Sequence, residues 1–319
     1  MMTEYAHTPV LLNETLSFLG PREKNEWMVD ANAGEGGHSF AFLSNYPNLK
    51  LIAVDADSDI IAIAKSRLIQ FTDRVHFYCG WSHDFFTDYP SQIRRPNTIL
   101  FDLGISSYHF KKSGKGFTFE KDEFLDMRID STQALTAADL LARLGEKELA
   151  DLLYNNAQER YSRRIASSIV QQRQKSTITT TSALADLVYR SVPSAYRHGQ
   201  IHPATKTFQA LRIAVNGELS RLPSLLEAAF RTLEPGGRLG VISFHSSEDR
   251  IVKNFFRSMN RNCICPENAP ICNCEGRRSI NLLTKKGVTP CDEEIERNPP
   301  SRSARLRVAE KILEGDEND

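Results

Sequence analysis

The sequence lacks both an excess of charge of either sign and any long hydrophobic run. Lysine plus arginine and aspartate plus glutamate each number 40 in 319 residues, so the formal net charge is zero. A balanced charge gives no general attraction to nucleic acid, although a local basic patch would be sufficient. No apolar run approaches the roughly 18 residues of a membrane helix, and no signal peptide is recognisable. We therefore expect a soluble, cytoplasmic protein that does not contact a membrane.

Cysteine is scarce over most of the chain and crowded near its end. Cys79 stands alone, whereas the other five cysteines lie between residues 263 and 291. Disulfides are not expected in a cytosolic protein, so free thiols are the default. The alternative is a structural zinc site, although C-x-C departs from the usual spacing of zinc ligands. The four candidate ligands are Cys263, Cys265, Cys272 and Cys274.

Short apolar runs alternate with helical patterns in the first third of the chain. Near-continuous apolar runs are typical of parallel strands buried on both faces, and the segments between them have helical spacing. Such alternation predicts a parallel sheet with right-handed crossovers. The expected strands span residues 27–32, 51–57, 74–80, 97–104 and 238–244, with one more near 304–312.

The alternation stops between about residues 113 and 203, where the patterns are amphipathic and helical. We predict that 113–203 is an inserted helical domain for substrate recognition. Residues 1–112 and 204–319 would then form one discontinuous α/β domain. We expect its second part to open with a single long helix over 203–233.

A glycine-rich loop follows the first predicted strand and opens a predicted helix. In "ANAGEGGHSF" (31–40), Gly34, Gly36 and Gly37 would let a ligand approach the backbone closely at a helix N-terminus. Asp55 ends the second strand, where a carboxylate can accept hydrogen bonds from ribose hydroxyls. The two features together indicate a cofactor that contains a nucleoside.

The loop favours a methyl donor over a dinucleotide. A dinucleotide site has the pattern G-x-G-x-x-G, and the third glycine is missing from its usual place. Glu35 would also set a negative charge beside a pyrophosphate, which disfavours a dehydrogenase. S-adenosylmethionine has no phosphate and carries a sulfonium cation, so an acidic loop is tolerated. A purely structural turn would explain the glycines but not Asp55.

Two further strand ends carry polar side chains at the same predicted sheet edge. Asp102 ends the fourth strand, at the carboxyl edge where open α/β sheets bind ligands. His245 and Ser246 follow the fifth strand, and we expect them to converge on this edge. The alternative for Asp102 is a helix cap or a turn, and that for His245 is an ordinary structural role. A serine followed by Glu-Asp is also a good helix N-cap, and both roles could hold at once.

In order and spacing, these motifs resemble the RsmH (MraW) family of bacterial small-subunit ribosomal RNA methyltransferases. The resemblance runs nearly end to end. It rests on "GEGGHS" (34–39), "DLGISS" (102–107), "LDMRID" (125–130), "HPATKTFQALRIAVN" (202–216) and "SFHSSEDRIVK" (243–253).

The resemblance implies a class I (Rossmann-like) methyltransferase sheet with an inserted all-helical domain. It implies S-adenosylmethionine-dependent methylation of N4 of a cytosine in the decoding centre of 16S ribosomal RNA. We expect this RNA to be met within the assembled small subunit, and the oligomeric state is left open, a homodimer included. By motif match the donor-binding residues are Gly34, Gly36, Gly37, His38, Asp55, Trp81, Asp102 and His109.

Some positions depart from the family pattern. Asn32 stands where the family has threonine, and Tyr108 and His109 stand where it favours proline and glutamine. These departures leave open a second function, that of a ribosome-assembly or RNA-binding factor which has lost turnover on the same scaffold.

The chemistry requires an acceptor for a proton of the cytosine amine, and no metal. An acceptor would localise the N4 lone pair, and alignment with the methyl group would lower the barrier further. Asp102 is the first candidate, a hydroxyl of Ser106 or Ser246 is the second, and His245 would hold the acceptor in place. The basic residues expected at the RNA include Arg160, Arg163, Arg164, Lys206, Arg212, Arg277, Arg278, Lys285, Lys286, Arg302, Arg305 and Arg307.

Overall fold

The computed structural model describes residues 8–199, 201–262 and 277–313. The chain divides into two compact units. Met1–Ile105 and Arg221–Asp319 together form an α/β unit, and Ser106–Ser220 forms a helical unit. Each unit is described by itself below.

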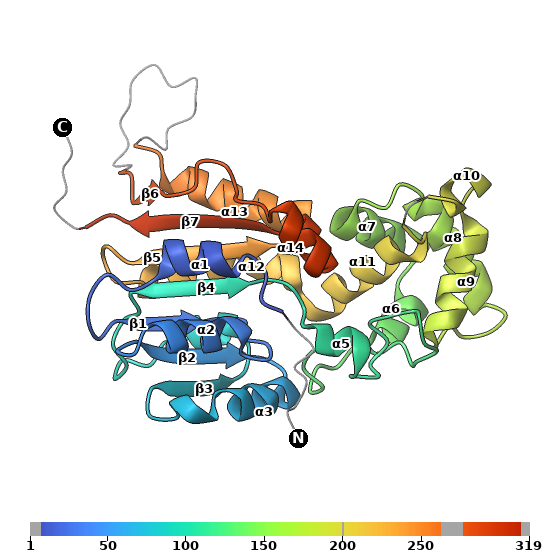
Figure 1. Ribbon diagram of the computed structural model, residues 1–319. Helices are drawn as coiled ribbons and strands as arrows, with labels where there is room; N and C mark the ends of the chain where they lie inside the picture. Colours follow the sequence, from blue (N-terminus) through green and yellow to red (C-terminus); the bar gives the residue numbers. More distant parts are fainter. Residues whose placement is uncertain (1–7, 200, 263–276, 314–319) are drawn as a thin grey trace, which may run out of the picture. The chain divides into compact units, whose positions relative to one another are not determined.

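The α/β unit is built on one seven-stranded sheet with the order β3-β2-β1-β4-β5-β7-β6 (Figure 1). Strands β1 to β5 are parallel, and β7 runs antiparallel to both β5 and β6. The predicted α/β fold, a largely parallel sheet with an inserted helical unit, is confirmed. The strands are β1 (Trp27–Asp30), β2 (Lys50–Asp55), β3 (Val75–Cys79), β4 (Thr98–Asp102), β5 (Arg238–Ser243), β6 (Ile280–Leu282) and β7 (Arg305–Lys311).

Helices cover both faces of this sheet, which explains the near-continuous apolar runs of its strands. Alternate residues of a strand point to opposite faces. Thus Val29 and Phe101 join a core with α4 (Ser82–Thr87), α12 (Glu218–Thr232) and α13 (Ser246–Met259). Met28 and Leu100 join a second core with α1 (Leu12–Leu19) and α2 (Gly37–Asn45). Helix α3 (Ser58–Arg67) contacts β2 and β3, and α14 (Asp292–Arg297) precedes β7.

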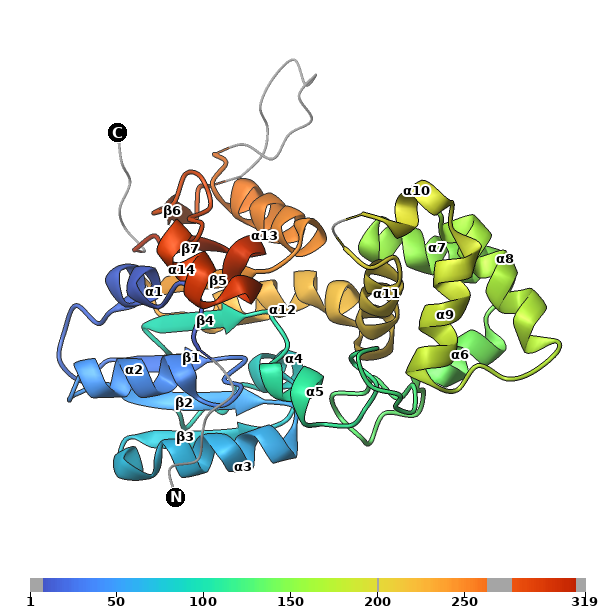
Figure 2. The same ribbon diagram turned by 45° about the vertical axis from the view of Figure 1, so that its right-hand side comes forward.

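The helical unit contains only helices as regular elements among its described residues. Four helices form the core of this unit: α7 packs against α8, α8 against α9, and α11 against both α9 and α7 (Figure 2). Their buried leucine and isoleucine side chains fill the space between them. The helices are α5 (Ser107–Lys111), α6 (Ala137–Arg143), α7 (Glu146–Ala157), α8 (Ser162–Arg173), α9 (Thr181–Ser191), α10 (Ser194–Arg197) and α11 (Ala204–Asn216).

The prediction of one long helix over 203–233 is wrong, because the helix breaks at Gly217. Gly217 has φ 63°, in the left-handed region that favours glycine. The buried Asn216 side chain accepts a hydrogen bond from the Ile129 amide at 2.9 Å and donates to the Met127 carbonyl at 2.8 Å. The break therefore fixes the end of α11 within the helical unit.

The structure also places α11 in the helical unit, whereas the sequence assigned it to the α/β domain. Asn156 of α7 donates to the Ala210 carbonyl of α11 at 3.0 Å, so α11 packs in the helical unit. The chain passes from one unit to the other at residues 105/106 and 220/221, whereas the sequence placed the insertion at 113–203. Amphipathic spacing marks α11 as half-buried but does not say which unit covers its apolar face.

Three further points concern the shortest strand, the membrane expectation and the cysteines. The short strand β6 was not predicted. Within the described ranges, every helix is too short or too polar to cross a membrane. The proposed zinc ligands Cys263, Cys265, Cys272 and Cys274 lie outside the described residues, while Cys79 and Cys291 are exposed thiols.

Candidate active site

Three aspartates end neighbouring strands at one edge of the sheet. Asp30 of β1 pairs in register with Ala53 of β2 and with Leu100 of β4. Asp55 and Asp102 therefore extend two residues further along the strands on either side of Asp30. Because the carboxyl ends of parallel strands meet at the same edge, these carboxylates face a common ligand region.

The glycine loop is fastened to the second strand. The Ala33 amide donates to the Val54 carbonyl at 3.0 Å, and the Gly34 amide donates to Oδ2 of Asp55 at 2.9 Å. Gly36 has φ 75°, and a Cβ there would lie 3.3 Å from the Leu68 side chain. Gly34 has φ 54°, and a Cβ there would meet no atom within 4 Å. The loop thus keeps a left-handed backbone with open space beside Gly34, which a ligand can approach.

Asp55 has a structural role as well as the predicted binding role. Its Oδ1 accepts a hydrogen bond from the Asp57 amide at 3.0 Å. Asp57 in turn caps α3 by accepting from the Asp59 amide at 2.8 Å. A carboxylate offers about four lone-pair sites, so these backbone bonds leave acceptor capacity for ribose hydroxyls. The loop and the α3 turn hold Asp55 in place for that contact.

His38 lies in the first turn of α2 and is 5% exposed. Its Nε2 atom is 3.6 Å from Oδ2 of Asp102, and its Nδ1 atom is 3.5 Å from Oγ1 of Thr15. These separations exceed the usual hydrogen-bond length, so the contact with Asp102 is a close polar one. The preceding Gly37 is required for packing, because a Cβ there would lie 2.6 Å from Cγ of Pro9.

Asp30 is a member of this site that was not predicted. Its side chain is 1% exposed and accepts a hydrogen bond from Oγ of Ser39 at 2.6 Å. Burial raises its pKa to about 6, against an opposing effect of His38. Its place at the end of the first strand, directly before the loop, was the signal that could have identified it.

Several buried oxygen atoms at this edge have no hydrogen-bond partner among the described residues. They are Oδ1 of Asp30, Oδ1 of Asn32 and Oδ1 of Asp102. Buried acceptors are normally satisfied, so unpartnered ones indicate a ligand or water. S-adenosylmethionine carries hydroxyl and ammonium donors and a sulfonium cation. Acceptors and carboxylates of this kind therefore fit the donor that the sequence predicted.

Trp81 follows β3 and precedes α4. The guanidinium of Arg221 lies over its ring, 4.6 Å from the ring centroid. This cation–π contact supports the indole from one side. Arg221 was not among the expected site residues, because the two positions are 140 residues apart in the chain.

At the end of β5, the N-cap of α13 is His245, whereas the sequence suggested a serine for that role. Its Nδ1 atom accepts a hydrogen bond from the Glu248 amide at 3.4 Å. The buried Glu248 carboxylate accepts from the amides of Phe244 and His245, at 2.9 and 3.3 Å. Ser246 is the exposed first residue of α13. His245 therefore fixes the turn after β5, and a role in holding the acceptor stays a prediction.

Ser106 and His109 belong to the helical unit. Ser106 caps α5, since its Oγ accepts a hydrogen bond from the Tyr108 amide at 3.2 Å. His109 is 3% exposed and packs against Phe117 with ring centroids 5.0 Å apart. The α/β unit brings together the glycine loop, His38, Asp55 and Asp102, whereas these two residues are placed by the fold of the other unit.

Two of the arginines expected at RNA are committed to the fold instead. Arg307 is 7% exposed and makes a bidentate pair with Asp249, at 2.7 and 3.1 Å. Arg212 makes a similar pair with Glu218, at 3.0 and 2.8 Å. Both guanidiniums are held by carboxylates, which disfavours their binding phosphates, and the expected RNA contact of these two residues stays a prediction. Charge density along the sequence does not distinguish a paired arginine from an exposed one.

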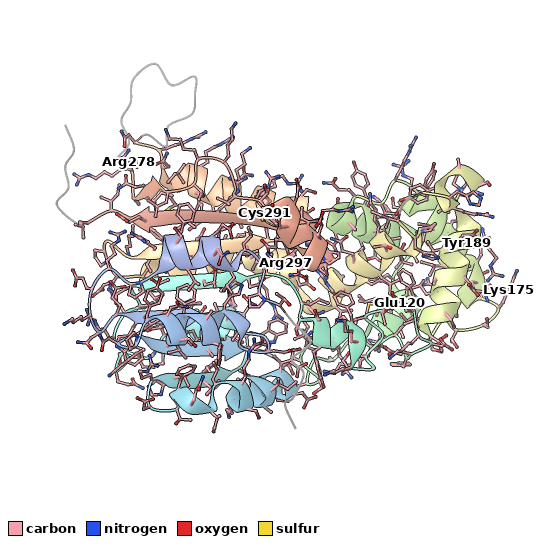
Figure 3. All side chains as sticks on the ribbon, in the orientation of Figure 1. Glu120, Lys175, Tyr189, Arg278, Cys291 and Arg297 are labelled. Atoms are coloured by element: carbon pink, nitrogen blue, oxygen red, sulfur yellow. The ribbon has the colours of Figure 1, made fainter. Side chains whose placement is uncertain are left out.

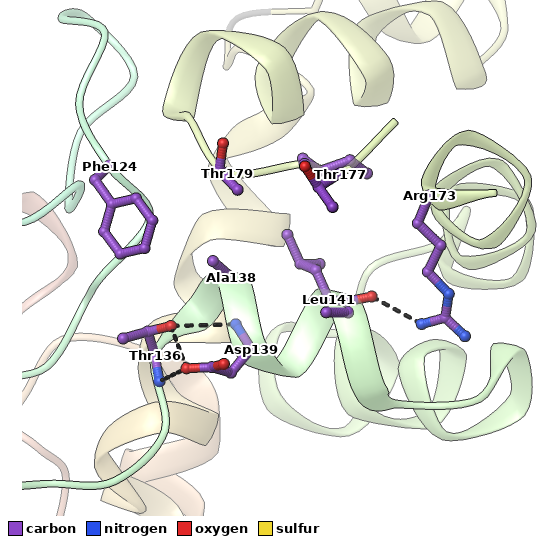
Figure 4. A pocket seen from close by; sticks show the side chains of 10 residues that line it. Phe124, Thr136, Ala138, Asp139, Leu141, Arg173, Thr177 and Thr179 are labelled. Atoms are coloured by element: carbon purple, nitrogen blue, oxygen red, sulfur yellow. Dashed lines mark hydrogen bonds between the residues drawn. The ribbon is translucent and has the colours of Figure 1, made fainter. Parts of the chain in front are cut away.

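The helical unit also contains a hollow of about 440 Å³ (Figure 4). Its charged side chains have partners within the protein. Arg173 donates to the carbonyls of Leu141 and Leu144, at 2.8 and 2.6 Å. Asp139 accepts from the hydroxyl of Thr136 at 2.6 Å, as part of the capping box of α6. These contacts close the end of α6, so we assign the hollow a structural role.

Comparison with known proteins agrees with the resemblance noted in the sequence. Residues 4–312 match the model of the MraW methylase family. A ribosomal RNA small subunit methyltransferase H from Treponema denticola is 58% identical, over 96% of this chain and 97% of that protein. A protein of the same name from Treponema pallidum is 41% identical, over 96% of this chain and 92% of that protein. A solved structure described as an rRNA methylase from Streptococcus thermophilus aligns over 98% of this chain and 99% of its own, at 11% identity and a TM-score of 0.39. The chain therefore belongs to the MraW methylase family.

Proposed function

We propose that this protein transfers the methyl group of S-adenosylmethionine to N4 of a cytidine in small-subunit ribosomal RNA. The observation that carries the proposal is the sheet edge where Asp102 lies 3.6 Å from His38, beside a glycine loop fastened to Asp55. Family membership supports the reaction type. The relatives' name, ribosomal RNA small subunit methyltransferase H, supports the substrate class.

The sheet edge provides a binding site for the donor. Asp55 would accept hydrogen bonds from the ribose hydroxyls, and the open backbone at Gly34 would lie against the nucleoside. Asp30 and Asp102 would provide negative charge for the cationic end of the molecule. When bound, S-adenosylmethionine supplies an electrophilic methyl group and leaves as a neutral thioether.

Asp102 would act on the amine of the target base. The N4 lone pair is delocalised into the cytosine ring and is a poor nucleophile. A carboxylate oxygen that accepts an N4 hydrogen would localise the lone pair and take the proton once the N–C bond has formed. His38, in polar contact with Asp102, would limit its rotation and keep the oxygen aligned. Positioning of this kind can lower the barrier by several kcal/mol.

The substrate we propose is the assembled small subunit rather than free RNA. A chain with zero net charge has little non-specific attraction to naked RNA, so shape and local contacts must supply recognition. This substrate places the reaction in the cytoplasm. A homodimer is a further proposal, which sedimentation of the purified protein would test.

The experiment that tests the function is methyl transfer from labelled S-adenosylmethionine to small subunits that lack the modification. We expect label in one cytidine of the RNA with the wild-type protein and at least 100-fold less with Asp102→Ala. Because Asp102 also faces the cationic end of the donor, calorimetry would measure the donor Kd of both proteins, and transfer would be compared at donor concentrations that saturate each. Donor binding without transfer by the wild-type protein would contradict the proposal and favour an assembly factor on the same scaffold.

A further inference from the structure

We propose that the turn between α7 and α8 is a docking site for the RNA phosphate backbone, with Tyr154 as a stacking platform for one base. The inference rests on the proposed function for its ligand, a ribosomal RNA. It concerns the helical unit alone and is independent of the donor site. The surface is a cavity of about 490 Å³, lined by Asp151, Tyr154, Arg160, Tyr161, Arg163 and Arg164, among others.

A buried glutamate builds the turn that carries these arginines. Glu159 is 0% exposed, and its carboxylate accepts from the Tyr161 amide at 2.7 Å and from the Tyr196 hydroxyl at 3.2 Å. Gln158, with φ 51°, ends α7 in the left-handed conformation. The rings of Tyr161 and Tyr196 meet edge to face, 4.9 Å apart. The buried contacts of Glu159, Tyr161 and Tyr196 therefore fix the turn, and Arg160 lies exposed on its surface.

Burial, together with the adjacent Glu159 carboxylate, raises the pKa of Tyr196 to about 12. The hydroxyl thus stays protonated and donates to Glu159 at neutral pH. Because this donor and the Tyr161 amide both bind the carboxylate, Glu159 is occupied inside the turn. Its charge is directed away from the cavity surface.

The three arginines at this cavity differ from the other arginines discussed above. Arg160, Arg163 and Arg164 are exposed, and among the described residues no side-chain hydrogen bond or ion pair is found for them. The guanidinium of Arg160 lies over the ring of Tyr161, 5.7 Å from the ring centroid. Three positive charges face one negative charge, that of Asp151, in the lining. In the hollow of Figure 4, by contrast, the guanidinium of Arg173 is bound to two carbonyls. Arginines without carboxylate partners around a concave surface are suited to phosphate oxygens, which they bind bidentately.

An exposed aromatic ring at the same cavity favours a nucleic acid over an acidic protein. Tyr154 is 60% exposed, so the face of its ring is accessible to a ligand at this cavity. Nucleobases stack on such rings, while neighbouring arginines follow the phosphates of the strand. An acidic peptide would use the arginines and leave the ring without a planar partner.

The main test replaces the three arginines together. The triple variant Arg160→Gln, Arg163→Gln, Arg164→Gln should bind small subunits at least tenfold more weakly than the wild type at about 0.15 M salt. The slope of log affinity against log salt should flatten by about 0.7–0.9 for each phosphate that the variant no longer neutralises. Donor affinity should not change and thermal stability should change little, because the side chains are exposed and the cation–π contact of Arg160 with Tyr161 is at the surface.

The matched control removes the same charge elsewhere on the helical unit. Lys121, Lys175 and Arg190 are exposed and lie outside the cavity, and Lys175 is labelled in Figure 3. Their triple replacement by glutamine should leave the affinity and the salt slope near those of the wild type. An equal loss of affinity in the control variant would mean that only overall charge matters, and it would overturn the docking site.

Two variants of Tyr154 test the stacking. Tyr154→Phe keeps the ring and should bind as the wild type does, whereas Tyr154→Ala should bind about fivefold more weakly or worse. A photoreactive phenylalanine analogue at this position should cross-link to ribosomal RNA. Cross-linking to a ribosomal protein instead would overturn the assignment of the partner.

Methyl transfer separates this inference from the proposed function. If the wild-type protein methylates small subunits and the arginine variant does so with unchanged KM, the docking site is wrong and the function stands. A raised KM with little change in kcat is the expected result, since remote contacts contribute binding energy uniformly. If the wild-type protein transfers no methyl group yet the arginine variant binds more weakly, the docking site stands without the function.

Discussion

The sheet edge of the α/β unit and the α7–α8 turn of the helical unit hold their charged side chains in opposite ways. In the α/β unit, Asp30 and Asp102 at the sheet edge are 1% and 8% exposed, and Arg307 within β7 is paired with Asp249 of α13. At the α7–α8 turn Arg163 and Arg164 stand exposed and without ionic partners among the described residues. The difference corresponds to the ligands we propose for each. A small donor has to be surrounded by fixed groups, whereas a polymer has to be met on an open surface.

The energetic consequences of the two arrangements also differ. Buried charges lose hydration, so they are tolerated only when paired or when they serve a ligand. Their attraction to an oriented ligand is strong, because water does not screen it. Exposed arginines add little to folding, and their attraction to phosphates weakens steeply as salt rises. We therefore expect variants of the sheet edge to change stability and donor binding, and variants of the turn to change RNA binding alone.

The largest effect on stability is expected for Arg307→Ala. The variant leaves Asp249 partly buried without its bidentate partner, which should lower the free energy of unfolding by about 3 kcal/mol. Denaturant titration would measure the change. The double variant Asp249→Ala, Arg307→Ala should be less destabilised than the sum of the two single variants, since no unpaired charge remains. If Arg307→Ala kept full stability but flattened the salt dependence of RNA binding, Arg307 would belong with the exposed arginines.

A smaller effect is expected for Asp55→Ala, on donor affinity. The variant removes a charged acceptor from the ribose and frees the Gly34 amide, so the Kd for S-adenosylmethionine should rise about 10- to 100-fold. Calorimetry would measure it, and Asp59→Ala, an exposed aspartate of the neighbouring helix, is the control. The affinity for small subunits should be the same for both variants. A donor Kd close to that of the wild type would remove Asp55 from the site.

The sequence predicted those parts of the fold that depend on local pattern. The apolar runs identified β1 to β5 because these strands are buried on both faces, and the glycines marked the loop at 31–36. Asp55 and Asp102 were found because strand ends in a parallel sheet gather at one edge. These are features whose chemistry can be read within a few neighbouring residues.

Features set by distant contacts were not predicted. The helix break at Gly217 depends on Asn216 bonding to Met127 and Ile129, almost 90 residues earlier. The role of Arg307 depends on Asp249, which lies on a separate helix. Neither pairing leaves a local pattern in the sequence. A basic residue that pairs with a distant carboxylate therefore looks the same in the sequence as one that binds RNA.

Asp30 gives the smallest expected effect and the one most specific to a buried charge. Its ordinary pKa of 3.8 is raised to about 6 in the folded protein, chiefly by burial. Between these values the folded state binds a proton that the unfolded state does not, so stability falls as pH rises. The contribution is fully present below about pH 3.8 and is lost as pH passes 6. Above that, the ionised carboxylate costs on the order of 3 kcal/mol.

Asp30→Asn should therefore stabilise the protein at pH 7.5 and leave it nearly unchanged at pH 4. The gain at pH 7.5 should be about 1–2 kcal/mol, less than the full cost, because the new amide hydrogens need an acceptor in the same buried place. Thermal unfolding at the two pH values would measure it, with Asp59→Asn as the exposed control. An equal shift of Tm at both pH values would attribute the effect to packing around Ser39 and not to ionisation. In that case ionisation of the buried Asp30 carboxylate would not destabilise the fold, and the sheet edge would not differ from the α7–α8 turn in this respect.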